Sequence, residues 1–122
     1  MKRYIKISVI CSMAFFAISC GKQHKAENVI KDFLDENMST SEYSISFNDI
    51  DSTRNITDSM INVMKNNARK NKLFKKEIVY GSSMTAKPYI YARTKICNGK
   101  DTVPYTFYLD KTLNSVIAFK RN

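Results

Sequence analysis

An Asn98-Gly99 pair lies between two runs in which apolar and polar residues alternate, and it constrains the fold of this chain more than any other feature. Both central residues of a type I′ turn need positive φ, which asparagine and glycine tolerate best. We therefore expect a β-hairpin with arms at Met84 to Cys97 and Thr102 to Asp110. Asn98 and Gly99 would be its two loop residues.

This loop predicts a register for the hairpin. With Cys97 opposite Lys100, Ile90 faces Phe107, and apolar side chains gather on one face of the two strands. A register that sorts the side chains so cleanly is strongly specified. Pro104 would then lie in a hydrogen-bonded pair without an N–H to donate, so we expect a bulge or a strand edge there.

Two segments carry the spacing of amphipathic helices. Apolar residues from Ala26 to Asn37 recur at intervals of three and four, which places them on one helical face. A polar stretch from Asp49 to Thr53 offers N-caps for a second helix. The expected buried stripe of that second helix is Ile56, Met60, Val63, Met64 and Ala68.

Strand patterns occupy most of the remaining chain. Tyr43 to Phe47 alternates apolar with small polar residues, Glu77 to Tyr80 is a short candidate, and Ser115 to Lys120 would close a meander after the hairpin. The order helix, strand, helix, then four strands predicts an α+β domain with both helices on one face of a curved antiparallel sheet. This order resembles the cystatin-like and nuclear-transport-factor-2-like superfolds, and the resemblance implies a fold and no activity.

The first twenty residues have the three parts of a secretory signal. A cationic start precedes Ile7 to Ser19, which is uncharged and too short to span a hydrocarbon core of about 30 Å. Ile18-Ser19-Cys20 resembles the bacterial lipobox, which implies cleavage before Cys20 and acylation of its thiol by palmitate-type chains. We therefore expect a signal peptide at 1–19, a lipidated cysteine and polar tether at 20–25, and a single domain at 26–122.

The resemblance to lipoproteins also implies a location. Acidic residues directly after the cysteine, which direct surface export in some lipoprotein families, are absent, so we expect an outer-membrane anchor facing the periplasm. The formal charge of +9 falls to +6 when Lys2, Arg3 and Lys6 leave with the signal. In the cell envelope, anionic headgroups and glycans meet a basic surface, and we expect no nucleic-acid partner.

A run of basic residues follows the second helix. Bases near a helix C-terminus stabilise its dipole, which explains the first of them. The later ones favour a patch that faces a membrane or a polyanion. The candidate patch is Lys70, Lys72, Lys75 and Lys76.

The sequence contains no pattern typical of catalysis. It lacks a serine elbow, a glycine-rich phosphate loop and histidine or cysteine residues at metal-binding spacing. His24 lies in the expected tether, and Cys97 is either a small buried apolar residue or a reactive thiol. We predict a protein that is not an enzyme and that has no metal or cofactor.

The polar face of the hairpin is the best candidate site, because tyrosine and arginine anchor many interfaces. An ordinary solvent-facing sheet surface would carry similar residues. We expect an envelope lipoprotein that binds a protein partner as an inhibitor, immunity factor or accessory protein. The alternative is a small-ligand or glycan binder with a concave pocket at Tyr105 and Phe107. The candidate partner-binding residues are Tyr89, Tyr91, Arg93, Lys95 and Tyr108.

Three tripeptides resemble the Asp-Ser/Thr-aliphatic acceptor of a bacterial O-glycosylation system. Their hydroxyl residues are Ser52, Ser59 and Thr102. Helix capping and turn formation also account for these residues, so both interpretations stay open.

Overall fold

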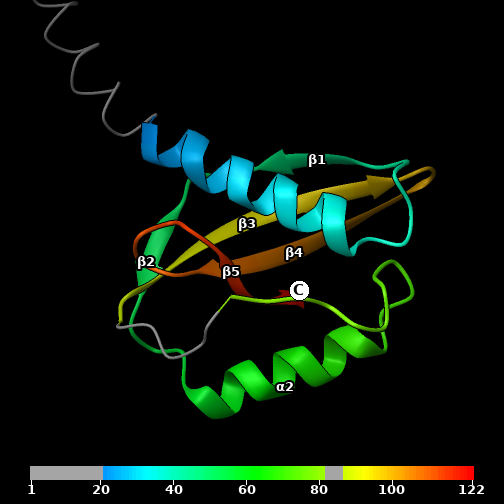
Figure 1. The fold of residues 1–122 in the computed structure, drawn as a ribbon. Helices are drawn as coiled ribbons and strands as arrows, with labels where there is room; N and C mark the ends of the chain where they lie inside the picture. Colours follow the sequence, from blue (N-terminus) through cyan, green and yellow to red (C-terminus); the bar gives the residue numbers. More distant parts are fainter. Residues whose placement is uncertain (1–20, 82–86) are drawn as a thin grey trace, which may run out of the picture.

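The computed structural model of this protein describes residues 21–81 and 87–122. An N-terminal helix (residues 21–37) is followed by elements that Figure 1 labels: β1 (Ser44–Phe47), β2 (Asp51–Thr53), α2 (Asp58–Arg69), β3 (Tyr89–Asn98), β4 (Asp101–Leu109) and β5 (Val116–Arg121). The α+β class with two helices and an antiparallel sheet is confirmed. The expected signal peptide, the expected lipidation site Cys20 and residues 84–86 of the expected hairpin lie outside the described residues. No helix in the described ranges has the length and apolarity needed to cross a membrane.

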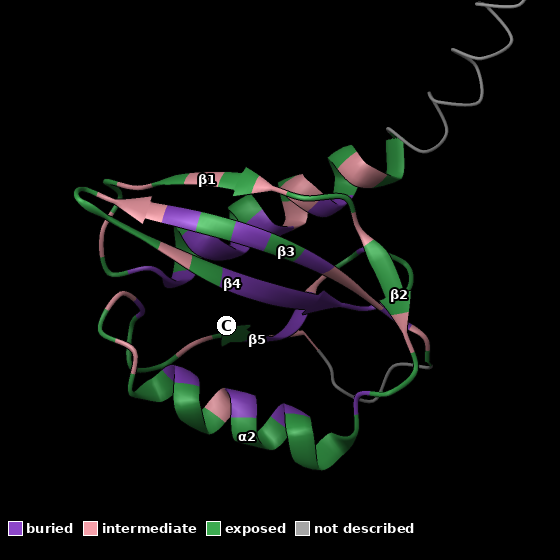
Figure 2. Ribbon diagram, turned by 180° about the vertical axis from the view of Figure 1, so that it is seen from behind, coloured by how far each residue is buried: buried purple, intermediate pink, exposed green. Residues whose placement is uncertain are grey.

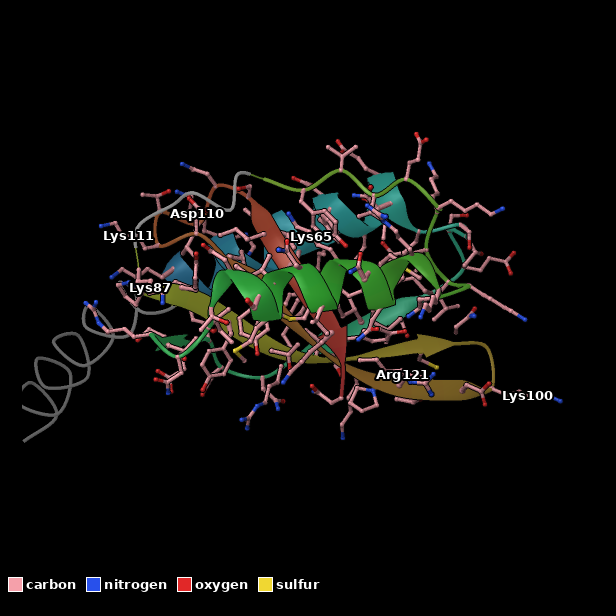
Figure 3. The ribbon with its side chains drawn as sticks, turned by 90° about the horizontal axis from the view of Figure 1, so that it is seen from below. Lys65, Lys87, Lys100, Asp110, Lys111 and Arg121 are labelled. Carbon is pink, nitrogen blue, oxygen red and sulfur yellow. The ribbon has the colours of Figure 1, made fainter. Side chains whose placement is uncertain are left out.

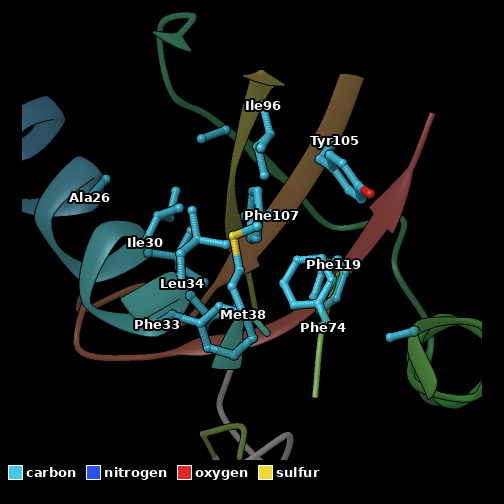
Figure 4. Close-up of a cluster of buried hydrophobic side chains, with 14 of the residues drawn as sticks. Ala26, Ile30, Phe33, Leu34, Met38, Phe74, Ile96, Tyr105, Phe107 and Phe119 are labelled. Atoms are coloured by element: carbon cyan, nitrogen blue, oxygen red, sulfur yellow. The ribbon is translucent and has the colours of Figure 1, made fainter. Parts of the chain in front are cut away.

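The N-terminal helix packs across one face of the sheet, which we call the inner face. Ala26, Ile30 and Leu34 are fully buried there, as their spacing predicts, and Figure 4 shows them facing Ile96 and Phe107 of the strands. Residues 21–25, expected as a tether, are helical.

Gln23 fastens the beginning of this helix to the segment between β1 and β2. Its amide nitrogen donates to the Asn48 carbonyl at 3.1 Å, and its amide oxygen accepts from the Ile50 N–H at 2.8 Å. The domain is therefore ordered from the first residue that the structure describes.

The sheet has the strand order β1-β3-β4-β5, with β2 beside β1 on the same edge of β3. β2 was not expected, because Asp51 to Thr53 looked like a helix cap. The backbone groups of this segment pair with β3 instead, and Thr57 supplies the cap of α2 by accepting from the Met60 N–H at 3.2 Å.

The hairpin is present, but its predicted register is wrong by one residue on each arm. Asn98 pairs with Asp101 and Ile90 pairs with Leu109, so Gly99 and Lys100 form the loop. Gly99 has φ of +69°, as the first central residue of a type II′ turn requires. The partner of each β3 residue is therefore displaced by two residues along β4, from Phe107 to Leu109 in the case of Ile90. An even displacement keeps every side chain on its predicted face.

Pro104 gives the physical reason for this register. It lies opposite Lys95, three pairs away from the Asn98–Asp101 pair, which closes the two-residue loop as a hydrogen-bonded pair. Pairs alternate along an antiparallel ladder, so Pro104 falls in a pair that needs no N–H toward β3. Its carbonyl accepts from the Asn122 N–H on the other side at 2.9 Å. The bulge expected at Pro104 is absent from the β3–β4 ladder.

A bulge occurs instead where β4 pairs with β5. Tyr108 pairs with Ala118 and Leu109 pairs with Val116, which leaves Ile117 as the additional residue. Val116 faces the inner core, while Ile117 and Ala118 belong to a second apolar cluster with Tyr108. This irregularity lets four consecutive residues of β5 be buried.

α2 lies along β5, and this placement corrects the expectation that both helices pack on one face (Figure 1). Its buried residues are Ile61, Met64 and Ala68. Met60 and Val63, expected in the core, are 44% and 57% exposed. The buried face of α2 is rotated from the predicted one, so that Ile61 is buried and Met60 is exposed, because the helix packs along β5.

Residues 77–81 are an extended connection without strand pairing, so the candidate strand at Glu77 to Tyr80 is wrong. Asn37 holds the neighbouring chain. Its side-chain amide donates to the Phe33 carbonyl at 2.8 Å, and its side-chain oxygen accepts from the Val79 N–H at 3.0 Å. The Gly81 N–H then donates to the Val116 carbonyl at 2.8 Å, which joins the connection to β5.

Gly81→Ala should destabilise the protein by about 1–3 kcal/mol, because a Cβ at this position would overlap the Cβ and Oγ atoms of Ser115. Chemical denaturation measures the loss. Ser115→Gly removes both of these atoms, so the double variant should recover part of the stability that Gly81→Ala loses. Equal stability of the Gly81→Ala variant and the parent would contradict this packing.

The β4–β5 turn is organised by the buried carboxylate of Asp110. It accepts from the backbone N–H groups of Asn114 and Ser115 at 2.8 and 2.9 Å and from the Thr112 hydroxyl. Burial alone would raise the pKa of Asp110, but these hydrogen bonds to the charged form outweigh it and lower the pKa. Leu113 adopts φ of 59° within this turn and is buried, so its packing offsets the backbone strain.

The lowered pKa of Asp110 predicts a pH dependence of stability. Its contribution is fully present above the unfolded-state pKa of about 4 and is lost as the pH falls through the lower folded-state value. Asp110→Asn should therefore cost about 1–3 kcal/mol at pH 7. The difference between the variant and the parent should shrink as the pH falls below the unfolded-state pKa of about 4 in denaturation experiments. A difference that stayed constant with pH would assign the effect to the neutral side chain.

Candidate functional site

The outer face of the sheet, opposite the N-terminal helix, carries the predicted partner-binding residues. Figure 2 shows β3 and β4 from this side, with the N-terminal helix behind them and α2 along the β5 edge. Arg93 and Lys95 are exposed and Tyr91 is half-buried. Tyr89 and Tyr108 are only 2% and 6% exposed and belong to the apolar cluster under α2. The structure therefore divides the five residues into three that a partner can reach and two that support them.

Tyr91, Arg93 and Tyr108 border an open hollow of about 540 Å³ on this face. The Arg93 guanidinium lies 5.8 Å from the centre of the Tyr91 ring, and the Tyr91 and Tyr108 rings are 6.2 Å apart. On the far side, the Thr106 hydroxyl donates to the Asn122 side chain at 3.0 Å. Stacking of this kind orients Arg93 while leaving its N–H groups available.

An apolar groove on α2 continues this hollow. It is bordered by Ile56, Met60 and Val63, and it shares Tyr108 and Lys120 with the hollow on the sheet. Sequence reasoning missed this groove because it placed Met60 and Val63 in the core. Helical spacing alone allows either stripe of α2 to be buried, and only the position of β5 decides between them.

Basic side chains surround this combined surface. Arg93, Lys120 and Arg121 line it, and no acidic residue lies among the described residues that border the hollow and the groove. Asp51, which pairs with Tyr91, is exposed on β2 at the margin. We call Met60, Val63, Tyr91, Arg93 and Lys120 the outer surface.

The predicted basic patch is exposed but does not act as one unit. Lys70 and Lys72 line a hollow of about 580 Å³ between α2 and the hairpin. Lys76 borders a different hollow, of about 570 Å³, with Lys65 and Arg69. Lys75 is exposed and lines neither of these two.

The inner face is filled by side chains. Tyr105 and Phe107, the expected lining of a ligand pocket, are 1% and 0% exposed, and of the two only Tyr105 borders the hollow beside Lys70 and Lys72. Phe33 and Phe119 contact Phe107 with ring centres 6.2 and 5.4 Å away. A small ligand has no space at Phe107.

Other candidate groups give no reactive site. Cys97 is half-buried with its thiol 3.5 Å from the Gly99 carbonyl. Within residues 21–81 and 87–122, no three histidine, cysteine or acidic side chains gather as metal ligands. Burial raises the pKa of Tyr80 to about 12, although the positive charge of Arg69 opposes this increase. The Tyr80 hydroxyl therefore stays protonated.

Ser52, Ser59 and Thr102 are exposed, so a glycan could reach each hydroxyl.

Comparison with known proteins gives no family from which a function could be inferred. The chain matches no protein-family model, no curated protein and no solved structure.

Proposed function

We propose that this protein is a noncatalytic lipoprotein of the bacterial cell envelope that binds an acidic protein partner through its outer surface. The observation that carries the proposal is the continuity of the Tyr91–Arg93 hollow with the apolar groove of α2. An inhibitor, an immunity factor or an assembly accessory would use such a surface.

The composition of this surface supports protein recognition. Aromatic residues, methionine and arginine are enriched at the centres of protein interfaces. Met60 and Val63 are large apolar side chains left open to solvent, and Arg93 is oriented by the Tyr91 ring. The surrounding cations favour a partner segment that combines apolar anchors with carboxylates.

The filled inner face also favours a protein partner over a small ligand held in the concave sheet. Phe107 is fully buried beneath Phe33 and Phe119. The N-terminal helix lying across a sheet that ends in a meander is consistent with a relation to cystatin-like or nuclear-transport-factor-2-like folds. This relation supports the architecture and gives no activity.

Lipidation at Cys20 would hold the domain at the outer membrane, facing the periplasm. The proposal rests on the cationic start, the short apolar run and the Ile18-Ser19-Cys20 motif. Two or more acyl chains anchor a protein stably where one chain would not. Because Gly21 already belongs to the N-terminal helix, the folded domain would begin directly at the anchor.

Cys20→Ser should abolish acylation and leave an uncleaved precursor. Palmitate labelling and intact mass spectrometry of the protein from a bacterial host measure both effects, and Cys97→Ser is the matched control that should keep the lipid. Label that stays in Cys20→Ser, or that is lost in Cys97→Ser, would contradict the assignment.

Tyr91→Ala/Arg93→Ala and Met60→Gln/Val63→Gln should each weaken binding to the partner by at least roughly tenfold, as expected for residues at the centre of an interface. The partner would be captured from envelope extract with the full-length protein, purified, and its affinity measured by calorimetry.

Lys111→Gln, an exposed change in the β4–β5 turn, is the control and should leave the affinity unchanged. Thermal denaturation checks that each variant stays folded. A captured protein whose affinity is the same for all variants would show that the outer surface is not the interface.

A further inference from the structure

The hollow between the end of α2 and the hairpin adjoins the outer surface, with which it shares Lys120 and the neighbouring Arg121, but Lys70 and Lys72 lie elsewhere. Lys70 and Lys72 stand on one wall, and Lys120 and Arg121 stand on the other, where β5 ends. Figure 3 shows Arg121 at the end of β5, next to the hairpin of β3 and β4. A single acidic residue, Asp101, lines this hollow, so the cations are in clear excess.

The loop that carries Lys70 and Lys72 is fixed before any ligand arrives. The Asn71 side chain donates to the Tyr105 hydroxyl at 2.8 Å and accepts from the Leu73 N–H at 3.0 Å. The Ser39 hydroxyl donates to the carbonyls of Lys72 and Leu73 at 3.1 and 3.0 Å. A ligand that binds here therefore does not have to order the backbone, which lowers the cost of binding.

The remaining lining indicates the kind of anion. Asn67 and Asn98 bring side-chain amides, which both donate to and accept from hydroxyl groups. Half-buried Leu73 and Val103 offer apolar surface between them. Amides, cations and a small apolar floor together complement a sugar that carries an acidic group.

The hollow lies far from any lipid headgroup next to the proposed anchor. The loop after α2 joins the end of the N-terminal helix, since the Lys75 N–H donates to the Asn37 carbonyl at 2.8 Å. Residue 21, next to the proposed anchor, lies at the opposite end of that helix, about 24 Å away at 1.5 Å per residue. That separation is larger than the screening length of about 8 Å at physiological salt.

We propose that this hollow is a binding site for an acidic saccharide, with Lys70, Lys72, Lys120 and Arg121 holding its carboxylates and Asn67 and Asn98 holding its hydroxyl groups. The hollow shares Lys120 with the outer surface, but Tyr91, Arg93, Met60 and Val63 do not line it, and Lys70 and Lys72 line neither the Tyr91–Arg93 hollow nor the groove on α2. Variants of Lys70 and Lys72 therefore test this site apart from the protein partner.

The test is calorimetric titration of the full-length lipidated protein, in bilayer discs of neutral lipid, with a hexameric oligogalacturonate. Lys70→Gln/Lys72→Gln should weaken binding by at least roughly tenfold, the value of one lost charge-assisted hydrogen bond. Lys75→Gln/Lys76→Gln removes the same charge outside the hollow and should change the affinity by less than about twofold, because distant surface charges are screened. Asn67→Ala should weaken binding without changing the charge.

Three results would overturn the proposal. Equal weakening by both lysine pairs would show attraction by net charge only. Inorganic phosphate that competes at the same concentration as the hexamer would show a simple anion site. No binding of the hexamer at low salt would show that the hollow is not a saccharide site.

Met60→Gln/Val63→Gln tests the protein partner and should leave this titration unchanged, so the two proposals can fail separately.

Discussion

The aromatic ring of Phe119 is the contact on which the arrangement of this protein depends. Phe119 lies on β5, yet its ring meets side chains from the N-terminal helix, from the chain after α2 and from β4, with ring centres between 4.4 and 6.3 Å apart. Each such pair contributes roughly 0.5–1.5 kcal/mol beyond the area that it buries. The rings that surround it are Phe33, Phe74, Tyr80, Tyr105 and Phe107.

The position of Phe119 also determines where ligands can bind. Its neighbours in the chain, Ala118 and Lys120, point to the outer face, where Lys120 borders the hollow beside Arg93. Because the Phe119 ring packs on Phe107, the centre of the inner face is core, and Tyr105 and Phe119 line a hollow at the end of the sheet. The hollows used in the two proposals lie on the outer face and at the end of the sheet near Arg121.

The sequence was sufficient to predict the hairpin and its two faces, but it could not fix the pairing. Asn98-Gly99 and Gly99-Lys100 are both acceptable loops, and the alternation of side chains is identical in the two registers. Pro104 distinguishes them, since it is compatible with only one of the two ladders without a bulge. In the predicted register Pro104 lacked an N–H to donate to β3. With Gly99 and Lys100 as the loop, no such donor is needed at Pro104.

The candidate site was partly predictable for a related reason. Tyr91, Arg93 and Lys95 follow from strand alternation and lie on the outer face as expected. Whether a residue on that face is reachable depends on α2, which covers Tyr108 and leaves Met60 open. The position of a helix along a strand edge is a tertiary property, and no local spacing encodes it.

The broken strand at the other edge of the sheet determines how a partner can approach. β1 and β2 both pair with β3, but the register moves by one residue across Asn48 to Ile50, so the outermost strand is two short pieces instead of one long straight one. A long regular edge would be a template for a strand from another chain, through backbone hydrogen bonds that do not depend on side chains. Interrupting that edge discourages indiscriminate strand addition. Recognition is left to side chains, which can discriminate between one neighbour and another.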